Sequence, residues 1–140
     1  MHSVLFLCTG NSCRSQMAEA IINHECKADW QAFSAGTLPA GFVHPMAIKV
    51  LSEIGINHHG RSKSIQEFYG EVFDQVITVC GDAEQNCPVW LGLGNKIHIG
   101  FPDPAKFVGT DEEVLCEFRS TRDRMRKEII DYLDSIEDTK

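Results

Sequence analysis

Eight residues near the N-terminus, Cys8 to Ser15, combine a thiol, a guanidinium and small turn-forming residues. They follow the apolar run Val4–Leu7 and precede a stretch with helical periodicity. A strand that ends in a tight turn and opens a helix directs backbone N–H groups and the positive end of the helix dipole at one point. Those groups and Arg14 favour a thiolate at Cys8, and the planar guanidinium can hold two oxygens at once. The pattern therefore predicts a thiol nucleophile in a cradle for a tetrahedral oxyanion.

The remaining residues of this loop suit the same chemistry. The Ser15 hydroxyl can hydrogen-bond the thiolate or a departing group, and Asn11 tolerates the left-handed backbone conformation that a tight loop needs. A cysteine and an arginine five residues apart also occur by chance, as a buried thiol and a surface cation. The preceding strand, the small residues and the following helix favour the oxyanion site instead. We expect the anion to contact Thr9, Gly10, Asn11, Ser12, Cys13 and Arg14.

Segments with strand and helix patterns alternate along the chain. We expect four strands, at residues 3–8, 30–35, 76–79 and 96–99. We expect helices at residues 15–26, 44–54 and 110–136, with a short helical stretch at 65–69. Strands separated by helices imply a parallel sheet with right-handed crossovers and helices on both faces. The sequence therefore predicts a single α/β domain over residues 1–140, with a doubly wound four-stranded parallel sheet.

The carboxyl ends of the predicted strands bring further reactive groups to the loop. In sheets of this kind the ligand site lies beyond those ends, and Cys8, Cys80 and Asp103 follow three different strands. We therefore expect two thiols that are distant in sequence to share one edge of the sheet. Asp103 lies between two prolines, where an aspartate often only forms a turn. Its position after the fourth strand favours a second role, protonation of a departing oxygen.

Composition narrows the class of protein and its partners. The 140-residue chain has 43% hydrophobic residues, enough for a single core. Its formal net charge of −7 argues against nucleic acid and anionic membranes as partners. No segment has the pattern of a secretory signal or a membrane span, so we expect a cytoplasmic protein. Six cysteines in such a chain indicate reactive thiols. We expect no metal centre, because six residues separate Cys80 from Cys87 and the histidines are scattered.

Three segments of the chain resemble the thioredoxin-coupled arsenate reductases, which are relatives of the low-molecular-weight protein tyrosine phosphatases. The segments are residues 8–19, Val79–Pro88 and Asp103–Ala105, and they occur in the family's order. The loop alone identifies the superfamily, whereas Cys80 and Cys87 separate a reductase from a phosphatase. The resemblance implies a phosphatase-like fold, reduction of arsenate to arsenite in arsenic detoxification, no cofactor and a monomeric state.

The resemblance also implies a mechanism. Cys8 attacks arsenate held by Arg14 and the loop, while Asp103 protonates the departing oxygen. Cys80 then attacks Cys8 and arsenite leaves, after which Cys87 attacks Cys80 by thiol–disulfide exchange. Thioredoxin or a related thiol reductant, such as glutaredoxin, would reduce the disulfide that results. Phosphate, which shares the charge and shape of arsenate, would be a weak analogue of the substrate.

Two other functions remain open at this stage. One is a low-molecular-weight protein tyrosine phosphatase, because the cradle cannot distinguish phosphate from arsenate. Residues Ala105–Val108, however, lack the paired tyrosines that phosphatases of this superfamily usually have after the aspartate. The other is a thiol-based oxyanion or redox sensor, for which the sequence offers no DNA-binding helix or basic patch.

Potassium is a further open question. Reductases that resemble this chain often hold the ion near the loop, with residues that match Asn11, Glu19 and Ser34. This chain has Gly60–Lys63 where those members have a threonine and an aspartate. The Lys63 ammonium could take the place of the cation, so the resemblance does not decide whether potassium binds.

Overall fold

The computed structural model describes residues 1–81 and 94–137, and it has the alternating α/β order that the sequence predicts. Its strands are β1 (His2–Cys8), β2 (Trp30–Gly36), β3 (Gln75–Thr78) and β4 (Asn95–His98). Its helices are α1 (Arg14–Glu25), α2 (Pro45–Ser52) and α3 (Asp111–Glu137), with the 3₁₀ helices η1 (Ile65–Phe68) and η2 (Pro104–Lys106). Each predicted element is present within two residues at its ends, and among the described residues η2 is the one element that the sequence analysis did not predict.

All four strands run parallel, in the order β2-β1-β3-β4. The register aligns Cys8 with Gly36, and Thr78 with Leu7 and His98. The four strands therefore end at one edge of the sheet, as the predicted topology requires. The loop of residues 8–15, Cys80 and the turn at Asp103 all lie just beyond this edge.

Strand β1 is central and buried on both faces, which explains its uninterrupted apolar sequence. Because successive side chains of a strand point to opposite faces, Val4, Phe6 and Cys8 belong to one core cluster. Leu5 and Leu7 belong to a second cluster on the opposite face. The first cluster includes the buried apolar residues of α1, α2 and α3, whereas the second includes Ile65 of η1.

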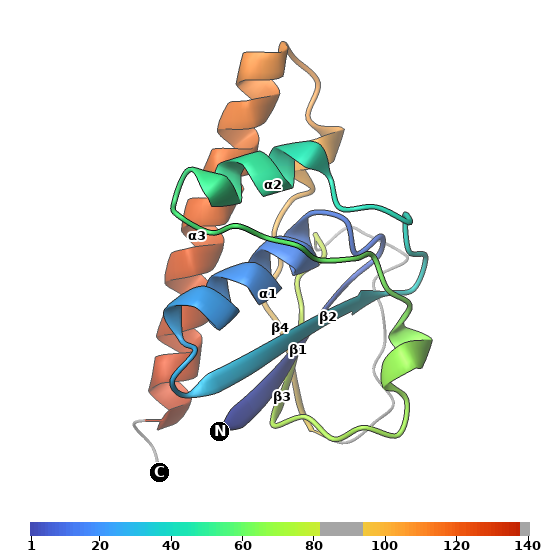
Figure 1. The fold of residues 1–140 in the computed structure, drawn as a ribbon, viewed down its shortest axis with the longest axis vertical. Coiled ribbons are helices and arrows are strands. Elements are labelled where there is room, and N and C mark those ends of the chain that lie inside the picture. The colour runs from blue at the N-terminus through green and yellow to red at the C-terminus, as the bar shows by residue number, and fades with distance from the viewer. Residues whose placement is uncertain (82–93, 138–140) are drawn as a thin grey trace.

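Helix α1 lies between the sheet and α2, with α3 packed against both helices (Figure 1). Eight of its twelve residues are buried, among them the polar side chains Arg14, Ser15 and Gln16 of its first turn. Polar groups in such positions need hydrogen-bond partners, and the site described below provides them. Within residues 1–81 and 94–137, no helix has both the length and the apolar character needed to cross a bilayer.

Candidate functional site

The loop between β1 and α1 turns its carbonyl groups outward. The backbone oxygens of residues 9, 10 and 12 each accept a 2.9 Å hydrogen bond, from the N–H groups of Leu38, Ala40 and His44 respectively. In a trans peptide the C=O and the following N–H point in opposite directions, so the amides of residues 10, 11 and 13 point away from that outer segment. These N–H groups, next to the N-terminus of α1, suit an anion.

Gly36 allows the loop to lie close to the end of β2. A Cβ atom at this position would be 2.4 Å from the Thr9 carbonyl oxygen and 3.0 Å from the Asn11 nitrogen. Both separations are too short for a side chain, so only glycine fits beneath the loop. The sequence analysis ended the second strand at residue 35 and assigned Gly36 no role, although a glycine at that point is the signal for a close backbone approach.

Asn11 fixes the shape of the loop. It is fully buried and has a φ of 47°, in the left-handed region that the sequence analysis expected it to tolerate. Its Oδ1 accepts hydrogen bonds from the Lys63 backbone N–H at 2.8 Å and from Gln16 Nε2 at 2.9 Å. Its Nδ2 donates to Ser15 Oγ at 2.7 Å. One side chain therefore connects the loop to α1 and to the segment before η1.

Cys8 lies at the end of β1 with its thiol against Ser15. The two side chains are buried, with Sγ and Oγ 2.8 Å apart. Because Ser15 Oγ accepts from Asn11, its own hydrogen is available for the Cys8 sulfur. The structure thus has the hydrogen bond between Ser15 and Cys8 that the sequence predicts, and a hydroxyl donor at this distance would favour a thiolate.

Arg14 and Asp103 approach each other beside the loop. Arg14 NH1 donates to the Phe101 carbonyl oxygen at 3.2 Å, and NH2 lies 3.6 Å from Asp103 Oδ2. The other carboxylate oxygen, Oδ1, accepts from the Ala105 backbone N–H at 3.0 Å and lies 3.5 Å from Cys13 Sγ. The Asp103 side chain is only 16% exposed, so the turn holds a carboxyl group against the guanidinium in a largely dry setting.

The surroundings of the Cys13 thiol disfavour it as an alternative nucleophile. Burial, together with the nearby Asp103 and Cys8, raises its pKa far above the usual range. A thiol that stays protonated is inert at neutral pH. The Cys13 side chain instead packs against Asp103, with Sγ 3.5 Å from Oδ1, and its predicted backbone contact with the anion remains a prediction.

Cys80 lies on the strand edge next to Cys8. It follows β3, is fully buried, and has its Sγ 4.0 Å from the carbonyl oxygen of Leu7, the residue before Cys8. The Val79 N–H donates to the same oxygen at 2.9 Å. The second thiol thus lies at the strand edge that the topology predicts. Cys87, the third predicted thiol, lies outside the described residues.

Lys63 occupies the place where the resemblance raised the question of a potassium ion. Its Nζ is 3.7 Å from Glu19 Oε1, 3.4 Å from Ser34 Oγ and 2.9 Å from the Arg61 carbonyl oxygen that accepts from it. Glu19 and Lys63 are 14% and 11% exposed at their side chains, so the pair is largely desolvated. A potassium ion on the same oxygens would face this ammonium group, so the residues present do not fit the ion.

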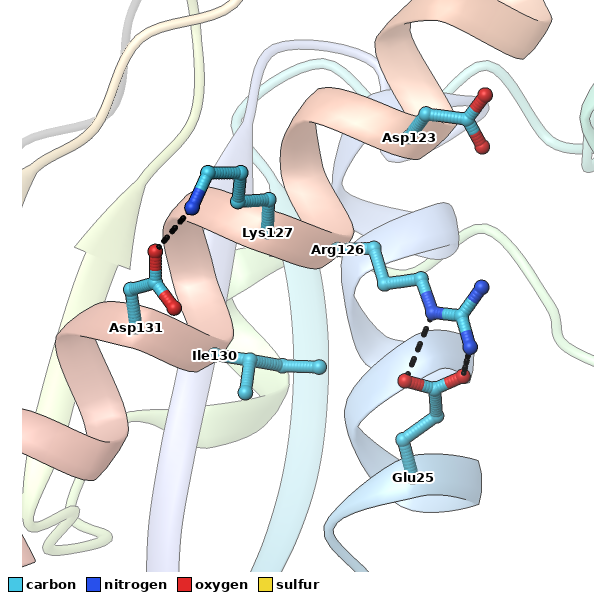
Figure 2. Close-up of a pocket in the computed structure, with 6 residues that line it drawn as sticks. All are labelled: Glu25, Asp123, Arg126, Lys127, Ile130 and Asp131. Atoms are coloured by element: carbon cyan, nitrogen blue, oxygen red, sulfur yellow. Dashed lines mark hydrogen bonds and ion pairs between the residues drawn. The ribbon is translucent and has the colours of Figure 1, made fainter.

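A pocket of about 390 Å³ lies elsewhere, between the end of α1 and the outer face of α3 (Figure 2). Four of its five charged groups pair with one another: Arg126 Nε donates to Glu25 at 2.9 Å, and Lys127 Nζ donates to Asp131 at 2.9 Å. Exposed pairs of this kind contribute little to stability. None of the predicted site residues lines this pocket.

Together these observations define a class of protein. Strand β1 of a parallel sheet ends in a buried cysteine, and it is followed by a loop whose amides point away from the outer segment and by an arginine at the start of a helix. This arrangement suits thiol chemistry on a tetrahedral oxyanion. The model of the low-molecular-weight phosphotyrosine protein phosphatase family matches residues 3–140, and the chain belongs to this family.

Several relatives and solved structures are similar to the chain. An arsenate reductase of Halalkalibacterium halodurans is 43% identical over 127 residues, 90% of this chain and 91% of its own. A structure described as an arsenate reductase in the phosphate binding state superposes with a TM-score of 0.76 at 29% identity, covering 97% of this chain and 99% of its own. A thioredoxin-dependent arsenate reductase of Corynebacterium glutamicum superposes with a TM-score of 0.69 at 29% identity, covering 100% and 64%. These similarities confirm the predicted fold class and the resemblance to arsenate reductases.

Proposed function

We infer that the protein is an arsenate reductase in which Cys8 is the nucleophile. The observation that carries this function is the second buried thiol at the strand edge. Cys80 lies beside the end of β1 with its sulfur 4.0 Å from the Leu7 carbonyl oxygen. Hydrolysis of a phosphate ester needs one thiol, whereas reduction of an oxyanion needs a second thiol to take up the oxidation. The arsenate reductase relatives support the same conclusion.

In the first step Cys8 binds arsenic. The Arg14 guanidinium and the inward-pointing amides hold the arsenate oxygens, and the Cys8 thiolate attacks arsenic as a hydroxyl departs. Asp103 supplies the proton with which that hydroxyl leaves as water. Before the attack the Ser15 hydroxyl donates a hydrogen bond to the Cys8 thiolate. Arsenic remains in oxidation state V in the thiol–arsenate adduct.

In the second step arsenic is reduced. The Cys80 thiolate attacks the Cys8 sulfur and forms a disulfide, and the electron pair of the S–As bond stays on arsenic, which leaves as arsenite in oxidation state III. Cys87 then attacks Cys80, which releases Cys8 as a thiolate and leaves a Cys80–Cys87 disulfide. Two thiols have lost two electrons and arsenic has gained two. No cofactor or metal takes part in these steps.

An external dithiol protein closes the cycle by reducing Cys80–Cys87. We propose thioredoxin, as the description of the C. glutamicum relative supports, with arsenate as substrate and phosphate as a weak analogue. Cys8, Cys13 and Cys116 are free thiols, which suits a reducing compartment such as the cytoplasm. We propose a monomer, since the chemistry uses residues of one chain.

The phosphatase is the rival function, because the same cradle suits phosphate. The three thiols separate the two functions. Wild-type protein treated with one equivalent of arsenate should lose two hydrogens by mass spectrometry, mapped to Cys80 and Cys87. Cys87→Ser should complete one turnover and stop as a Cys8–Cys80 disulfide, and Cys80→Ser should release no arsenite without an added thiol.

Cys116→Ser is the matched control, because it removes an exposed thiol of α3 and should leave the disulfide pattern and turnover unchanged. Hydrolysis of a phosphate ester should respond differently, because it requires Cys8 and Arg14 but neither Cys80 nor Cys87. The Cys80 and Cys87 variants should therefore keep any phosphatase activity of the wild type. The phosphatase would be the better assignment under two conditions. Wild-type protein would form no intramolecular disulfide with arsenate, and it would hydrolyse phosphate esters at the same rate as the Cys80 and Cys87 variants.

A further inference from the structure

A line of buried hydrogen bonds leads from Cys8 to a histidine outside the loop. Beyond Ser15 and Asn11 it continues through Gln16, whose Nε2 donates to Asn11 Oδ1 at 2.9 Å. It ends at His58, whose Nε2 lies 2.7 Å from Gln16 Oε1. Gln16 is fully buried, and His58 is half-buried on the wall of a pocket of about 330 Å³. The mechanism above uses neither Gln16 nor His58.

Backbone groups fix the orientation of the Asn11 amide. The Lys63 backbone N–H can only donate, so the Asn11 atom 2.8 Å from it is the oxygen. The amide nitrogen therefore faces Ser15 Oγ, 2.7 Å away, and donates to it. Ser15 is then left with one hydrogen of its own, which is the donor to Cys8 Sγ whenever that sulfur is a thiolate and carries no hydrogen.

The Gln16 amide is fixed in the same way. The Arg61 carbonyl can only accept, so the Gln16 atom 2.7 Å from it is the nitrogen, and the Gln16 oxygen faces His58. His58 must therefore donate from Nε2. Burial first, and then the Lys63 ammonium, lower the pKa of His58. The lowered pKa favours a neutral ring, in which the hydrogen bond to Gln16 places the single N–H on Nε2.

We propose that His58 and Gln16 are positioning residues for the Cys8 thiolate. The donors along the line all point toward Cys8, and each is oriented by the group farther from the sulfur. The histidine N–H holds the glutamine oxygen, the glutamine nitrogen holds the asparagine oxygen, and the asparagine nitrogen holds the serine hydroxyl. Aligned hydrogen bonds in a buried site polarise one another, so the outer residues stabilise the thiolate without contact with it. The inference rests on Cys8 being the nucleophile of the proposed function.

Gly60 gives independent support, because it leaves room for the outermost hydrogen bond. A Cβ atom at Gly60 would lie 2.3 Å from His58 Nε2 and 2.4 Å from Gln16 Oε1, the two atoms that form the bond. Gly60→Ala should therefore separate His58 from Gln16 while it keeps both side chains. It provides a second way to break the line, in addition to replacement of the histidine.

The pH profile of Cys8 alkylation by iodoacetamide tests the proposal, because the rate follows the thiolate fraction. Mass spectrometry of the tryptic peptide 1–14 distinguishes Cys8 from Cys13 by fragmentation. The variants are His58→Leu and Gly60→Ala, with His58→Gln as the rescue because its amide can donate. His59→Ala is the matched control, since it removes the neighbouring exposed ring. Thermal melting establishes whether each variant is folded. If His58→Leu does not fold, Gly60→Ala tests the proposal in its place.

Loss of one hydrogen bond in the line should move the Cys8 midpoint upward by about half a pH unit to one unit, a roughly three- to tenfold loss of alkylation rate below the midpoint. His58→Gln should recover most of the shift, and His59→Ala should show none. Folded variants of His58 and Gly60 with the wild-type midpoint would overturn the proposal. The assay contains no arsenate, so failure of the protein to reduce arsenate would refute the proposed function and leave this result unchanged.

Discussion

Replacement of Asn11 is the most demanding test of the loop geometry. Asn11→Ala removes three buried hydrogen bonds, to Ser15, Gln16 and the Lys63 backbone N–H. Each such bond contributes roughly 1 kcal/mol net, so about 3 kcal/mol of the free energy of unfolding should be lost. Alanine at a φ of 47° adds about 1 kcal/mol of backbone strain. The expected total of about 4 kcal/mol corresponds to a fall in melting temperature of roughly 10–15 °C.

Two further replacements at Asn11 separate these contributions. Asn11→Gly loses the same bonds without the left-handed strain, so urea denaturation should find it about 1 kcal/mol more stable than Asn11→Ala. Asn11→Asp keeps the acceptor for Gln16 and Lys63 but cannot donate to Ser15, whose hydroxyl would then turn to the new carboxylate. We therefore expect Asn11→Asp to lose arsenate reduction more severely than stability.

Asn57→Ala is the control for these measurements, because Asn57 is exposed on the segment before η1 and its replacement should leave the free energy of unfolding unchanged. The reasoning is refuted if the free energy of unfolding of Asn11→Ala lies within about 1 kcal/mol of the wild-type value, since the three bonds would then contribute nothing measurable.

Three other predictions concern single charged residues. Asp103→Ala should slow adduct formation roughly 100-fold or more in single-turnover assays yet remain folded, because it removes the general acid; unchanged turnover would leave Asp103 as a turn former. Hydrogen bonds from Arg119, and secondarily Arg122, lower the pKa of Glu53 from 4.5 to about 2, so this carboxylate stabilises the fold above about pH 4.5 and loses that effect as the pH falls toward 2. Wild type should therefore exceed Glu53→Gln in stability by at most about 1 kcal/mol at pH 7, and a difference that grows on acidification would contradict the assignment. Because Lys63 already occupies the cation position, exchange of sodium for potassium should leave the melting temperature within about 1 °C, less than a 1 kcal/mol effect, and a rise of several degrees specific to potassium would oppose this.

The sequence predicts the frame of the site well, because local patterns determine it. The uninterrupted apolar run of β1, the glycine-containing turn and the apolar positions of α1 specify a strand, a loop and a helix from neighbouring residues. Topology then brings the distant groups together, since parallel strands with helical crossovers end at one edge. Cys80 and Asp103 both leave from that edge, beside β1 and beside Arg14 respectively.

The supports of the loop could not be predicted in this way, because they depend on contacts between residues far apart in sequence. His58 is 42 residues from Gln16, and the Lys63 backbone N–H is 52 residues from the Asn11 oxygen that accepts from it. No local pattern distinguishes His58 from the exposed His59 beside it. The sequence analysis accordingly noted only that the histidines are scattered and assigned neither a role, although His58 belongs to the hydrogen-bond line. The sequence analysis did not predict the 3₁₀ helix η2 because only three residues form it, too few to show a helical pattern.

The burial of Cys8 and Cys80 explains why one disulfide is insufficient for the proposed reaction. Cys8 is 2% exposed, is paired with Gly36 in the sheet and is hydrogen-bonded to Ser15. A reductant protein cannot align its thiol with a sulfur held in this position, because thiol–disulfide exchange requires access to the sulfur that is attacked. Cys80 is equally buried, so a Cys8–Cys80 disulfide would be protected from reduction. A third thiol is therefore required to carry the oxidation outward. Cys87→Ser should consequently retain its Cys8–Cys80 disulfide when thioredoxin is added, whereas the wild-type Cys80–Cys87 disulfide should be reduced under the same conditions.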